Sequence, residues 1–396
     1  MQEAYIVAYG RSPIGKGNGK GIFAYERPDD VAAEVLKGVI NRVEGDFDVS
    51  LIEDVIVGCA FPEGGQGFNI GRTIALRAGL PYTVPGQTVN RYCSSGLQTI
   101  ALAANAIMAG QADVLVAGGV EFMSAVPMGG NEPTNNPTLQ KEDVGASYPM
   151  GLTAENVADK YGVSREDQDA FGAQSHQRAF VAQKEGRLAD EIIPIKVKRV
   201  KYTANGPEIY QELITEDEGI RPDSSSETLG KLRTIFKANG SVTAGTSSQI
   251  SDGASFTILM SADKVKELGI KPIARFVGFK AVGVDPKLMG IGPAYAIPEV
   301  LKLTKLSLED IDLFEINEAF ASQALASMRE LNVSSEITNV NGGAIALGHP
   351  LGATGAILTA RLLAEMKRRP ESRYGLVSMC IGVGMGAAAV FEYLHE

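Results

Sequence analysis

The chain of 396 residues contains no tryptophan, only three cysteines and only three histidines. Cys59, Cys93 and Cys380 are far apart in the chain, so neither a disulfide framework nor a zinc site with close ligand pairs is expected. This spacing is typical of free thiols in a reducing compartment. We expect no metal site, and we therefore consider each thiol and each imidazole as a candidate for chemistry.

A net positive charge and long apolar runs are also absent. The formal net charge is −10, which argues against nucleic-acid binding through a general basic field. No apolar run approaches the roughly 18 residues of a membrane span, and from the two ends we expect neither a targeting nor a lipidation signal. With 44% apolar and 21% charged residues, the composition is typical of a soluble globular protein, and we expect a cytoplasmic location.

Short β-rich runs alternate with longer helical patterns in the first third of the chain. The expected strands cover residues 4–8, 54–59, 86–90 and 114–117, and the expected helices cover residues 28–43, 69–78 and 96–109. This alternation predicts an α/β sheet with crossover helices.

The last third of the chain repeats this pattern, which indicates an internal duplication. Its expected strands cover residues 313–316, 374–380 and 386–393, and its expected helices cover residues 319–331 and 356–367. The middle is richer in charge, proline and asparagine, with an expected helix at 165–186 and a basic run at 196–201 that we interpret as solvated surface. We therefore divide the chain into an N-terminal half (residues 1–120 plus 251–271), an inserted loop domain (121–250) and a C-terminal half (272–396).

Cys93 lies where a predicted strand turns into a predicted helix. The run from Asn90 to Gly96 reads Asn-Arg-Tyr-Cys-Ser-Ser-Gly. A thiol at the amino end of a helix meets unpaired N–H groups and the positive end of the helix dipole, which favour a thiolate. The same N–H groups can hold an oxyanion after attack on a carbonyl. The alternative for Cys93 is a buried structural cysteine, which is also our interpretation of Cys59.

His349 stands in a run with five glycines within fourteen residues, from Gly342 to Gly355. The backbone is expected to turn tightly there and to approach its surroundings closely. An imidazole has a pKa near neutrality, so it suits proton transfer to or from a thiol. We interpret the other two histidines, His176 in a polar helix and His395 in the tail, as surface residues.

Two further segments end predicted strands with a reactive or polar side chain. Cys380 leads into the turn Gly382-Val-Gly-Met-Gly, which by itself could belong to a nucleotide loop or a simple hairpin. Asn317 follows the strand at 313–316 and could cap the next helix or hold a water for an oxyanion. Turns at strand ends gather on one face of a parallel sheet, where ligand sites form.

These four segments resemble the thiolase family. Asn-x-x-Cys-x-Ser-Gly, Asn-Glu-Ala-Phe, Gly-Gly-Ala-Ile-Ala-Leu-Gly-His-Pro-x-Gly and Cys-Ile-Gly-x-Gly-x-Gly follow one another here in the order that the family has. The resemblance spans nearly the whole chain. It implies an α/β thiolase fold, with duplicated five-stranded halves in a layered α-β-α-β-α arrangement and an inserted loop domain.

The resemblance also implies the roles of the site residues. Cys93 matches the nucleophile that carries the acyl group, and His349 matches the base that activates it. Cys380 matches the second acid/base, which moves the proton at the α-carbon. Asn317 matches the residue that positions an oxyanion-hole water with His349, and a second oxyanion hole would use backbone N–H groups of Cys93 and Gly382. Two thiols are needed because an acylated thiol cannot also donate a proton.

Coenzyme A is implied as a co-substrate, with no permanently bound cofactor. The basic residues Arg221, Lys231, Arg233 and Lys237 fall within seventeen residues of the loop domain, which makes a plausible patch for nucleotide phosphates. Arg221 matches the family's residue on the adenine and phosphate side. The other CoA-binding residues that the resemblance implies are Ser248, Ala244, Met150 and Phe320.

The degradative type of thiolase is the one that the sequence resembles more. Pro149 precedes Met150, where biosynthetic members typically carry histidine, and the runs 247–253 and 289–293 look like the degradative group. The resemblance thus favours a bacterial 3-ketoacyl-CoA thiolase of fatty-acid β-oxidation, with acyl-CoA and CoA as its small-molecule partners. It also implies a homodimer or homotetramer and leaves room for a hydratase/dehydrogenase partner.

Four alternatives stay open at this point. A biosynthetic acetoacetyl-CoA thiolase would join two acetyl-CoA molecules. A decarboxylating ketoacyl synthase would need a second histidine where Cys380 stands. A cysteine hydrolase could use Cys93, His349 and Asn317, but would give Cys380 no task. An acyl-CoA binding protein would bind without turnover.

Overall fold

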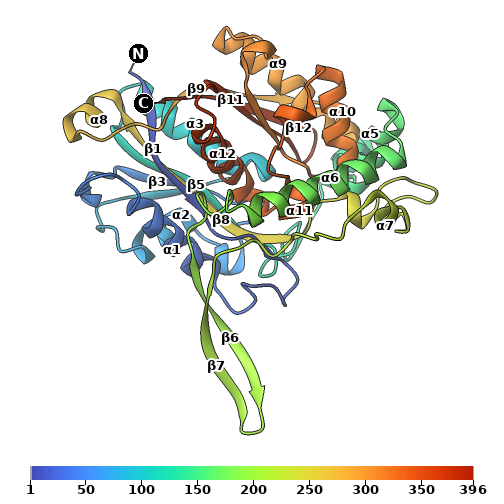
Figure 1. Ribbon diagram of the computed structural model, residues 1–396, viewed down its shortest axis with the longest axis horizontal. Helices are drawn as coiled ribbons and strands as arrows, with labels where there is room; N and C mark the ends of the chain where they lie inside the picture. Colours follow the sequence, from blue (N-terminus) through green and yellow to red (C-terminus); the bar gives the residue numbers. More distant parts are fainter. Residues whose placement is uncertain (1, 396) are drawn as a thin grey trace.

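The computed structural model describes residues 2–395, and its main element is one large mixed sheet. The strands follow one another across the sheet in the order β10-β11-β12-β9-β1-β8-β5-β3-β4, with the short β2 paired to β8 (Figure 1). The strands are β1 (Ala4–Arg11), β2 (Gly15–Lys16), β3 (Asp54–Gly58), β4 (Gly86–Val89), β5 (Val114–Phe122), β8 (Ser251–Ser261), β9 (Ala274–Gly283), β10 (Leu313–Ile316), β11 (Tyr374–Ile381) and β12 (Met385–Tyr393).

The sheet consists of two halves that meet at a narrow seam. Strands β1 and β9 pair only where Tyr5 and Ile6 face Arg275 and Ala274. Outward from the seam, the N-terminal half runs β1-β8-β5-β3-β4 and the C-terminal half runs β9-β12-β11-β10. The directions also match, because β3–β5 and β10–β11 are parallel pairs while β5–β8 and β11–β12 are antiparallel. The structure thus has the internal duplication expected from the sequence.

The two halves differ at their outer edges. The N-terminal half ends in the strand β4, which runs parallel to β3 and pairs with it over four residues. At the corresponding edge of the C-terminal half, only an isolated parallel bridge between Phe314 and Thr338 is present. The side chain of Asn339 extends this edge, because it accepts a hydrogen bond from the Ile316 N–H group and donates one to the Ile316 carbonyl.

Helices cover both faces of the sheet and fill the space between its halves, which gives the layered α/β fold. The helices of the two halves are α1 (Pro28–Ile40), α2 (Ile70–Arg77), α3 (Ser95–Met108), α8 (Ala262–Leu268), α9 (Gly292–Thr304), α10 (Ala321–Leu331), α11 (Ala344–Leu347) and α12 (Leu351–Lys367). Apolar residues of α1 and α2 form one outer core with the N-terminal strands, and those of α9 form another with the C-terminal strands. Helices α3 and α12 share the central core with strands of both halves (Figure 1).

Helices α3 and α12 approach one another at glycines. A Cβ atom on Gly96 would lie 2.8 Å from the backbone nitrogen of Ala356, and one on Gly355 would lie 2.3 Å from that of Leu97. Both glycines lie in the first turns of their helices. Because no side chain separates the two backbones there, the amino ends of the helices meet, and so do the turns that precede them.

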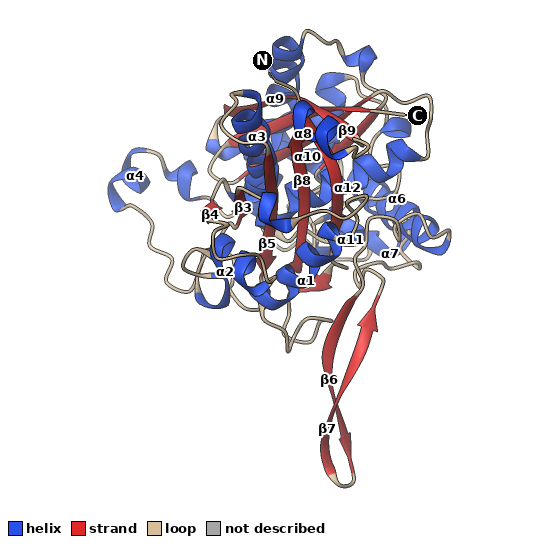
Figure 2. Cartoon of the chain, turned by 90° about the vertical axis from the view of Figure 1, so that its left-hand side faces the viewer, coloured by secondary structure: helices blue, strands red, loops and turns tan. Residues whose placement is uncertain are grey.

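The segment between β5 and β8 carries the remaining helices and a hairpin. The helices are α4 (Pro137–Glu142), α5 (Met150–Tyr161), α6 (Arg165–Lys184) and α7 (Ser226–Gly230), and the hairpin strands are β6 (Ile195–Thr203) and β7 (Gly206–Ile214). The hairpin projects away from the rest of the molecule (Figure 2), and Lys196, Lys198 and Lys201 of the basic run at its start are exposed. The predicted domain limits at residues 120, 250 and 271 stay predictions. No helix within residues 2–395 is both long and apolar enough to cross a membrane.

Candidate active site

Cys93 lies in a strained turn directly before α3. A short 3-10 turn, Tyr92–Ser94, joins β4 to the helix, and Tyr92 has a φ of 44°, in the left-handed region that non-glycine residues rarely occupy. The turn is held by hydrogen bonds from the Tyr92 N–H group to Asn90 Oδ1 and from Ser95 Oγ to the Tyr92 carbonyl. Backbone strain of this kind gathers at functional sites, where the surrounding structure enforces it.

The Cys93 thiol is protonated at neutral pH. Burial raises the pKa of Cys93 to about 11, although the backbone N–H groups of Gly382 and of Cys93 itself lower the pKa in part. The sequence argument expected the helix terminus to favour a thiolate, and this expectation is wrong because removal of the sulfur from water outweighs the helix terminus. To act as a nucleophile, this thiol would therefore need a base.

His349 is buried and hydrogen-bonded through both ring nitrogens. Its Nδ1 lies 2.6 Å from Thr354 Oγ1, and its Nε2 lies 3.3 Å from Asn317 Nδ2. The Thr354 hydroxyl donates to the Pro350 carbonyl, so it accepts the proton of His349 Nδ1. Nε2 then carries a lone pair. Burial lowers the pKa of His349 to about 4, which leaves the imidazole neutral and able to act as a base at pH 7.

Asn317 connects the histidine to the strand that carries Cys380. It follows β10, and its N–H group donates to the Ser378 carbonyl of β11. Helix α10 begins only at Ala321, so the side chain of Asn317 is not the cap of that helix. Its Oδ1 atom is buried and has no hydrogen-bond partner among residues 2–395, so this acceptor is available to a ligand or a water.

Cys380 is buried near the end of β11 and close to Cys93. Burial raises the pKa of its thiol, and the Cys93 sulfur raises it further. Apolar side chains surround Cys380, among them Met150 and Phe320. Beyond it, a Cβ atom on Gly382 would lie 3.3 Å from the Met150 methyl group, so Met150 is next to the same turn. The two thiols thus interact with one another, and Asn317 joins the imidazole of His349 to the strand that carries Cys380.

The predicted CoA-binding residues fall into two groups. Met150, Phe320 and Ser248 lie near Cys380, whereas Ala244 and Arg221 are exposed. Ser248 donates its N–H group to the Ala319 carbonyl, which places it beside Phe320 and Asn317 at the reaction centre. Ala244 is exposed in the short 3-10 turn Ala244–Thr246 that precedes Ser248.

Arg221 is exposed in the loop before α7, and its position is fixed by α6. Its N–H group donates to Nδ1 of His176. In the predicted basic patch, Lys231 is ion-paired with Glu227 and Lys237 with Asp159.

His176 corrects one sequence prediction. It is 3% exposed rather than a surface residue, because its side chain turns from α6 toward the Arg221 loop. Burial, and then the Arg221 charge, lower the pKa of His176 to about 4. His395 is exposed as expected.

Sequence reasoning missed Thr354 as a partner of the base. It stands five residues after His349 in the same motif, so one turn of helix from Pro350 brings its hydroxyl under the ring. This spacing of five residues is the feature of the sequence from which Thr354 could have been predicted as a partner of His349. Within residues 2–395, no group of three or more His, Cys, Asp or Glu side chains is arranged to hold a metal ion.

Comparison with known proteins places the chain in a family. The thiolase N-terminal domain matches residues 4–263, and the thiolase C-terminal domain matches residues 270–393. The chain belongs to the thiolase family. It is 52% identical to the 3-ketoacyl-CoA thiolase of Bacillus subtilis over 393 residues, which cover 99% of this chain and 100% of the relative.

Solved structures of thiolases have the same fold. The dimeric peroxisomal thiolase of Saccharomyces cerevisiae matches with a TM-score of 0.89 at 42% identity, covering 99% of this chain and 98% of that one. The acetyl-CoA acetyltransferase of Bacillus anthracis matches with a TM-score of 0.89 at 40% identity, covering 100% of this chain and 99% of that one. The expected layered α/β thiolase fold is confirmed.

Proposed function

We propose that the chain is an acyltransferase of the 3-ketoacyl-CoA thiolase type, which cleaves a 3-ketoacyl-CoA with CoA into acetyl-CoA and a shortened acyl-CoA. The observation that carries this proposal is a pair of interacting buried thiols, Cys93 and Cys380, whose strand Asn317 joins to the buried imidazole of His349. Full-length relatives named 3-ketoacyl-CoA thiolase, at 44–52% identity in bacteria, support the degradative type.

In the first half-reaction, His349 Nε2 takes the proton of Cys93, and the sulfur attacks the 3-keto carbon. The bond between carbons 2 and 3 then breaks, and its electron pair becomes the carbanion of acetyl-CoA. Cys380 donates its proton to that carbon, so acetyl-CoA leaves and the acyl group stays on Cys93. Backbone N–H groups of Cys93 and Gly382, which already face the Cys93 sulfur, stabilise negative charge on an oxygen bound there.

In the second half-reaction, the Cys380 thiolate takes the proton of an incoming CoA thiol. The CoA sulfur attacks the acyl carbon, and Cys93 leaves as a thiolate. The imidazolium of His349 returns its proton to Cys93, which restores both thiols and the neutral base. Two thiols in one site are needed because Cys93 is already bonded to the acyl group when the acetyl-CoA carbanion must receive a proton.

In this proposal the CoA site is supplied by the loop domain together with Phe320 of the C-terminal half. Met150 and Phe320 line the pantetheine arm next to Cys380, and Ser248 and Ala244 lie further along the same side. Arg221, which is exposed, faces the nucleotide end. In this proposal the loop domain covers residues 121–250, the N-terminal half covers residues 1–120 plus 251–271, and the C-terminal half covers residues 272–396. Residues 1 and 396 lie outside the part of the chain that the structure describes.

The assembly and the location of the protein are proposed from its relatives. A homodimer is supported by the dimeric peroxisomal thiolase of yeast, and a homotetramer is the alternative. A hydratase/dehydrogenase partner and a bacterial cytoplasmic location are proposed from the degradative role and from the Bacillus relative. Equilibrium sedimentation measures the assembly state directly.

The decisive experiment is mass spectrometry after mixing the protein with a 3-ketoacyl-CoA in the absence of CoA. We expect an acyl adduct on Cys93, and none in Cys93→Ala. In Cys380→Ser, acylation of Cys93 from a simple acyl-CoA should persist while cleavage of the carbon–carbon bond fails. An adduct on another residue, or cleavage that survives in Cys93→Ala, would reject the proposal.

A second candidate is a biosynthetic acetoacetyl-CoA thiolase. The acetyl-CoA acetyltransferase of Bacillus anthracis matches the fold as well as the yeast enzyme does, which favours testing it. Rates with acetoacetyl-CoA and 3-ketohexadecanoyl-CoA separate the two, and a rate confined to the four-carbon substrate would favour synthesis. Malonyl-dependent condensation, CoA-independent hydrolysis or binding without acylation would point to the synthase, hydrolase or binding-protein alternatives.

A further inference from the structure

The turn that carries His349 is held by buried side chains at both of its ends. It begins at Gly342, includes the four-residue α11 and continues into the first turn of α12. Gly342 and Gly348 have φ angles of 77° and 116°, so the chain changes direction on both sides of the short α11. The position of the base therefore depends on what the turn is attached to.

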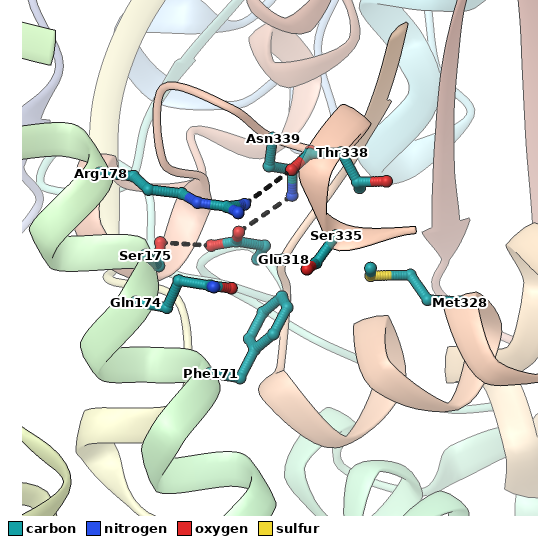
Figure 3. Close-up of a pocket in the computed structure, with 9 residues that line it drawn as sticks. All are labelled: Phe171, Gln174, Ser175, Arg178, Glu318, Met328, Ser335, Thr338 and Asn339. Carbon is teal, nitrogen blue, oxygen red and sulfur yellow. Dashed lines mark hydrogen bonds between the residues drawn. The ribbon is translucent and has the colours of Figure 1, made fainter. Parts of the chain in front are cut away.

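Glu318 holds the segment before His349, and Figure 3 draws two of its hydrogen bonds, with Ser175 and with Asn339. Its carboxylate accepts hydrogen bonds from Ser175 Oγ at 2.6 Å, from Asn339 Nδ2 at 2.9 Å and from the Ile345 N–H group at 3.3 Å. Ser175 Oγ in turn accepts the Gly343 N–H group at 3.0 Å. Glu318 thus binds the turn directly and through Ser175.

The carboxylate of Glu318 lies flat against the turn. A Cβ atom on Gly343 would lie 2.1 Å from Glu318 Cδ, so the glycine is required for this contact. Figure 3 shows the carboxylate between α6, which carries Ser175, and the segment of Asn339. Glu318 also follows Asn317 in the chain, so the same anchor sets the place of the amide that faces the imidazole.

Glu121 holds the segment after His349. It lies near the end of β5, is fully buried and accepts the Gly352 N–H group of α12 at 2.9 Å. It also accepts the N–H groups of Ala60 at 2.7 Å and Phe61 at 3.3 Å, and Gln66 Nε2 at 2.6 Å. Ala60 and Phe61 pack in the apolar cluster that contains Cys93. Glu121 thus joins the surroundings of the nucleophile to the helix behind the base.

We propose that Glu318 and Glu121 are positioning residues that hold the His349 turn from both ends and so set the distance between His349 and the Cys93 thiol. One carboxylate comes from each half of the sheet. Glu318 accepts a backbone N–H group before His349 in the chain, and Glu121 accepts one after it. The proposal deepens the function proposed above, because it rests on His349 as the base for Cys93. It assigns a role in the site to two buried side chains, of which Glu121 also acts on the Cys93 thiol through its charge, which raises the pKa of Cys93.

The test measures alkylation of Cys93 by iodoacetamide, read by mass spectrometry at pH 7, in Glu318→Gln and Glu121→Gln. A buried thiol reacts when a base takes its proton, and a well-placed general base contributes about 100-fold or more. We expect each isosteric variant to lose about tenfold of that rate, with a KM for acyl-CoA within about twofold of that of the unaltered protein. Unchanged alkylation in both variants would overturn the proposal.

A double-mutant cycle with His349→Ala shows whether the carboxylates act through the base. In the His349→Ala background, Glu318→Gln and Glu121→Gln should lower alkylation of Cys93 by less than about twofold, because the base they position is gone. A further tenfold loss in that background would mean that the carboxylates act on Cys93 or on the fold, and the proposal would be wrong.

Two more variants control for the general loss of a buried carboxylate and for a failure of Glu318→Gln to fold. Glu392→Gln is the matched control, since Glu392 is a buried carboxylate bound by Arg275 and Arg373 at the opposite end of β12 from the site. It should alter stability but not alkylation. If Glu318→Gln does not fold, Gly343→Ala displaces the same carboxylate and should give the same tenfold loss. Because alkylation needs no acyl-CoA, a protein that failed as a thiolase would still test the positioning.

Discussion

Each half of the sheet has a side chain at each of three equivalent positions, but the two halves use these side chains differently. The first residue after β3 is Cys59, and the first after β10 is Asn317. Two residues before α3 stands Cys93, and two before α12 stands His349. The second-last residue of β5 is Glu121, and that of β11 is Cys380.

All three side chains of the C-terminal half belong to the proposed reaction site, whereas the N-terminal half contributes only Cys93 to it. Cys59 and Glu121 bind each other instead, with 3.8 Å between Sγ and Oε1. A duplicated framework therefore offers two equivalent sets of positions at the ends of strands and helices. One set has become reactive, and two members of the other have become a support for it.

The largest effect is expected at the pair Asn317 and Cys59. Asn317→Ala removes the amide that faces His349 and that would position an oxyanion-hole water, and it should lower kcat by about 100-fold, a loss of the size seen when an oxyanion hole is damaged. Cys59→Ala, at the equivalent position, should leave kcat within about twofold and lower the free energy of unfolding by about 1 kcal/mol. Steady-state kinetics and urea unfolding measure the two effects. Equal kinetic losses would show that the halves are not divided in this way.

The contact between the central helices gives the second prediction. Gly355→Ala places a Cβ atom 2.3 Å from the Leu97 backbone nitrogen, so α3 and α12 must move apart. We expect a loss of about 2 kcal/mol in the free energy of unfolding. A fall in kcat should accompany it, since Cys93 and His349 precede these helices.

Gly283→Ala is the control for this contact. No heavy atom lies within 4 Å of a Cβ atom at Gly283, at the end of β9. The free energy of unfolding should change by less than about 0.5 kcal/mol, and kcat should not change. If Gly355→Ala behaved like the control, the close approach of the two halves would not matter for the site.

The outer edges of the halves give a similar effect on stability and a smaller effect on kcat. Asn339→Ala removes the side chain that pairs with both backbone groups of Ile316 in place of a strand, and leaves them buried. The free energy of unfolding should fall by about 2 kcal/mol, with a modest loss of kcat through Glu318. Gln87→Ala on the exposed edge strand β4 should cost less than about 0.5 kcal/mol, as measured by thermal unfolding. A larger cost at Gln87 would reverse this ranking.

Much of the framework was predictable from local patterns. The strand at 313–316 was predicted at its observed limits, and the strands at 54–59 and 86–90 were one residue too long, because turn residues mark these ends. Strand β8 was not assigned, since its buried face carries Ser255 and Thr257, which look polar in the sequence. Their hydroxyl groups bond backbone carbonyls of neighbouring strands, and only the folded sheet provides these partners.

The candidate site was predictable as a set of motifs but not as an environment. Cys93, His349, Cys380 and Asn317 were each recognisable because a strand end or a glycine turn marks them. Thr354 and Glu121 act through partners that the fold brings together, and Glu121 meets Gly352 across 231 positions of the chain. Burial also decided the charge state of Cys93, and burial of a turn residue cannot be derived from its neighbours in the sequence.

The smallest expected effect is the response of the reaction to pH, and it follows from burial of both partners. Burial shifts the pKa of each group toward its neutral form, upward to about 11 for Cys93 and downward to about 4 for His349. At pH 5.5 the imidazole is then still about 97% unprotonated, whereas an ordinary imidazole with a pKa near 6.5 would be only about 10% unprotonated. We therefore expect kcat/KM, which reports the free enzyme, to change by less than about twofold between pH 5.5 and 8. A tenfold loss centred near pH 6.5, measured at constant ionic strength, would contradict this. It would mean that water reaches His349, and that the C-terminal half does not shield its base as the N-terminal half shields its thiol.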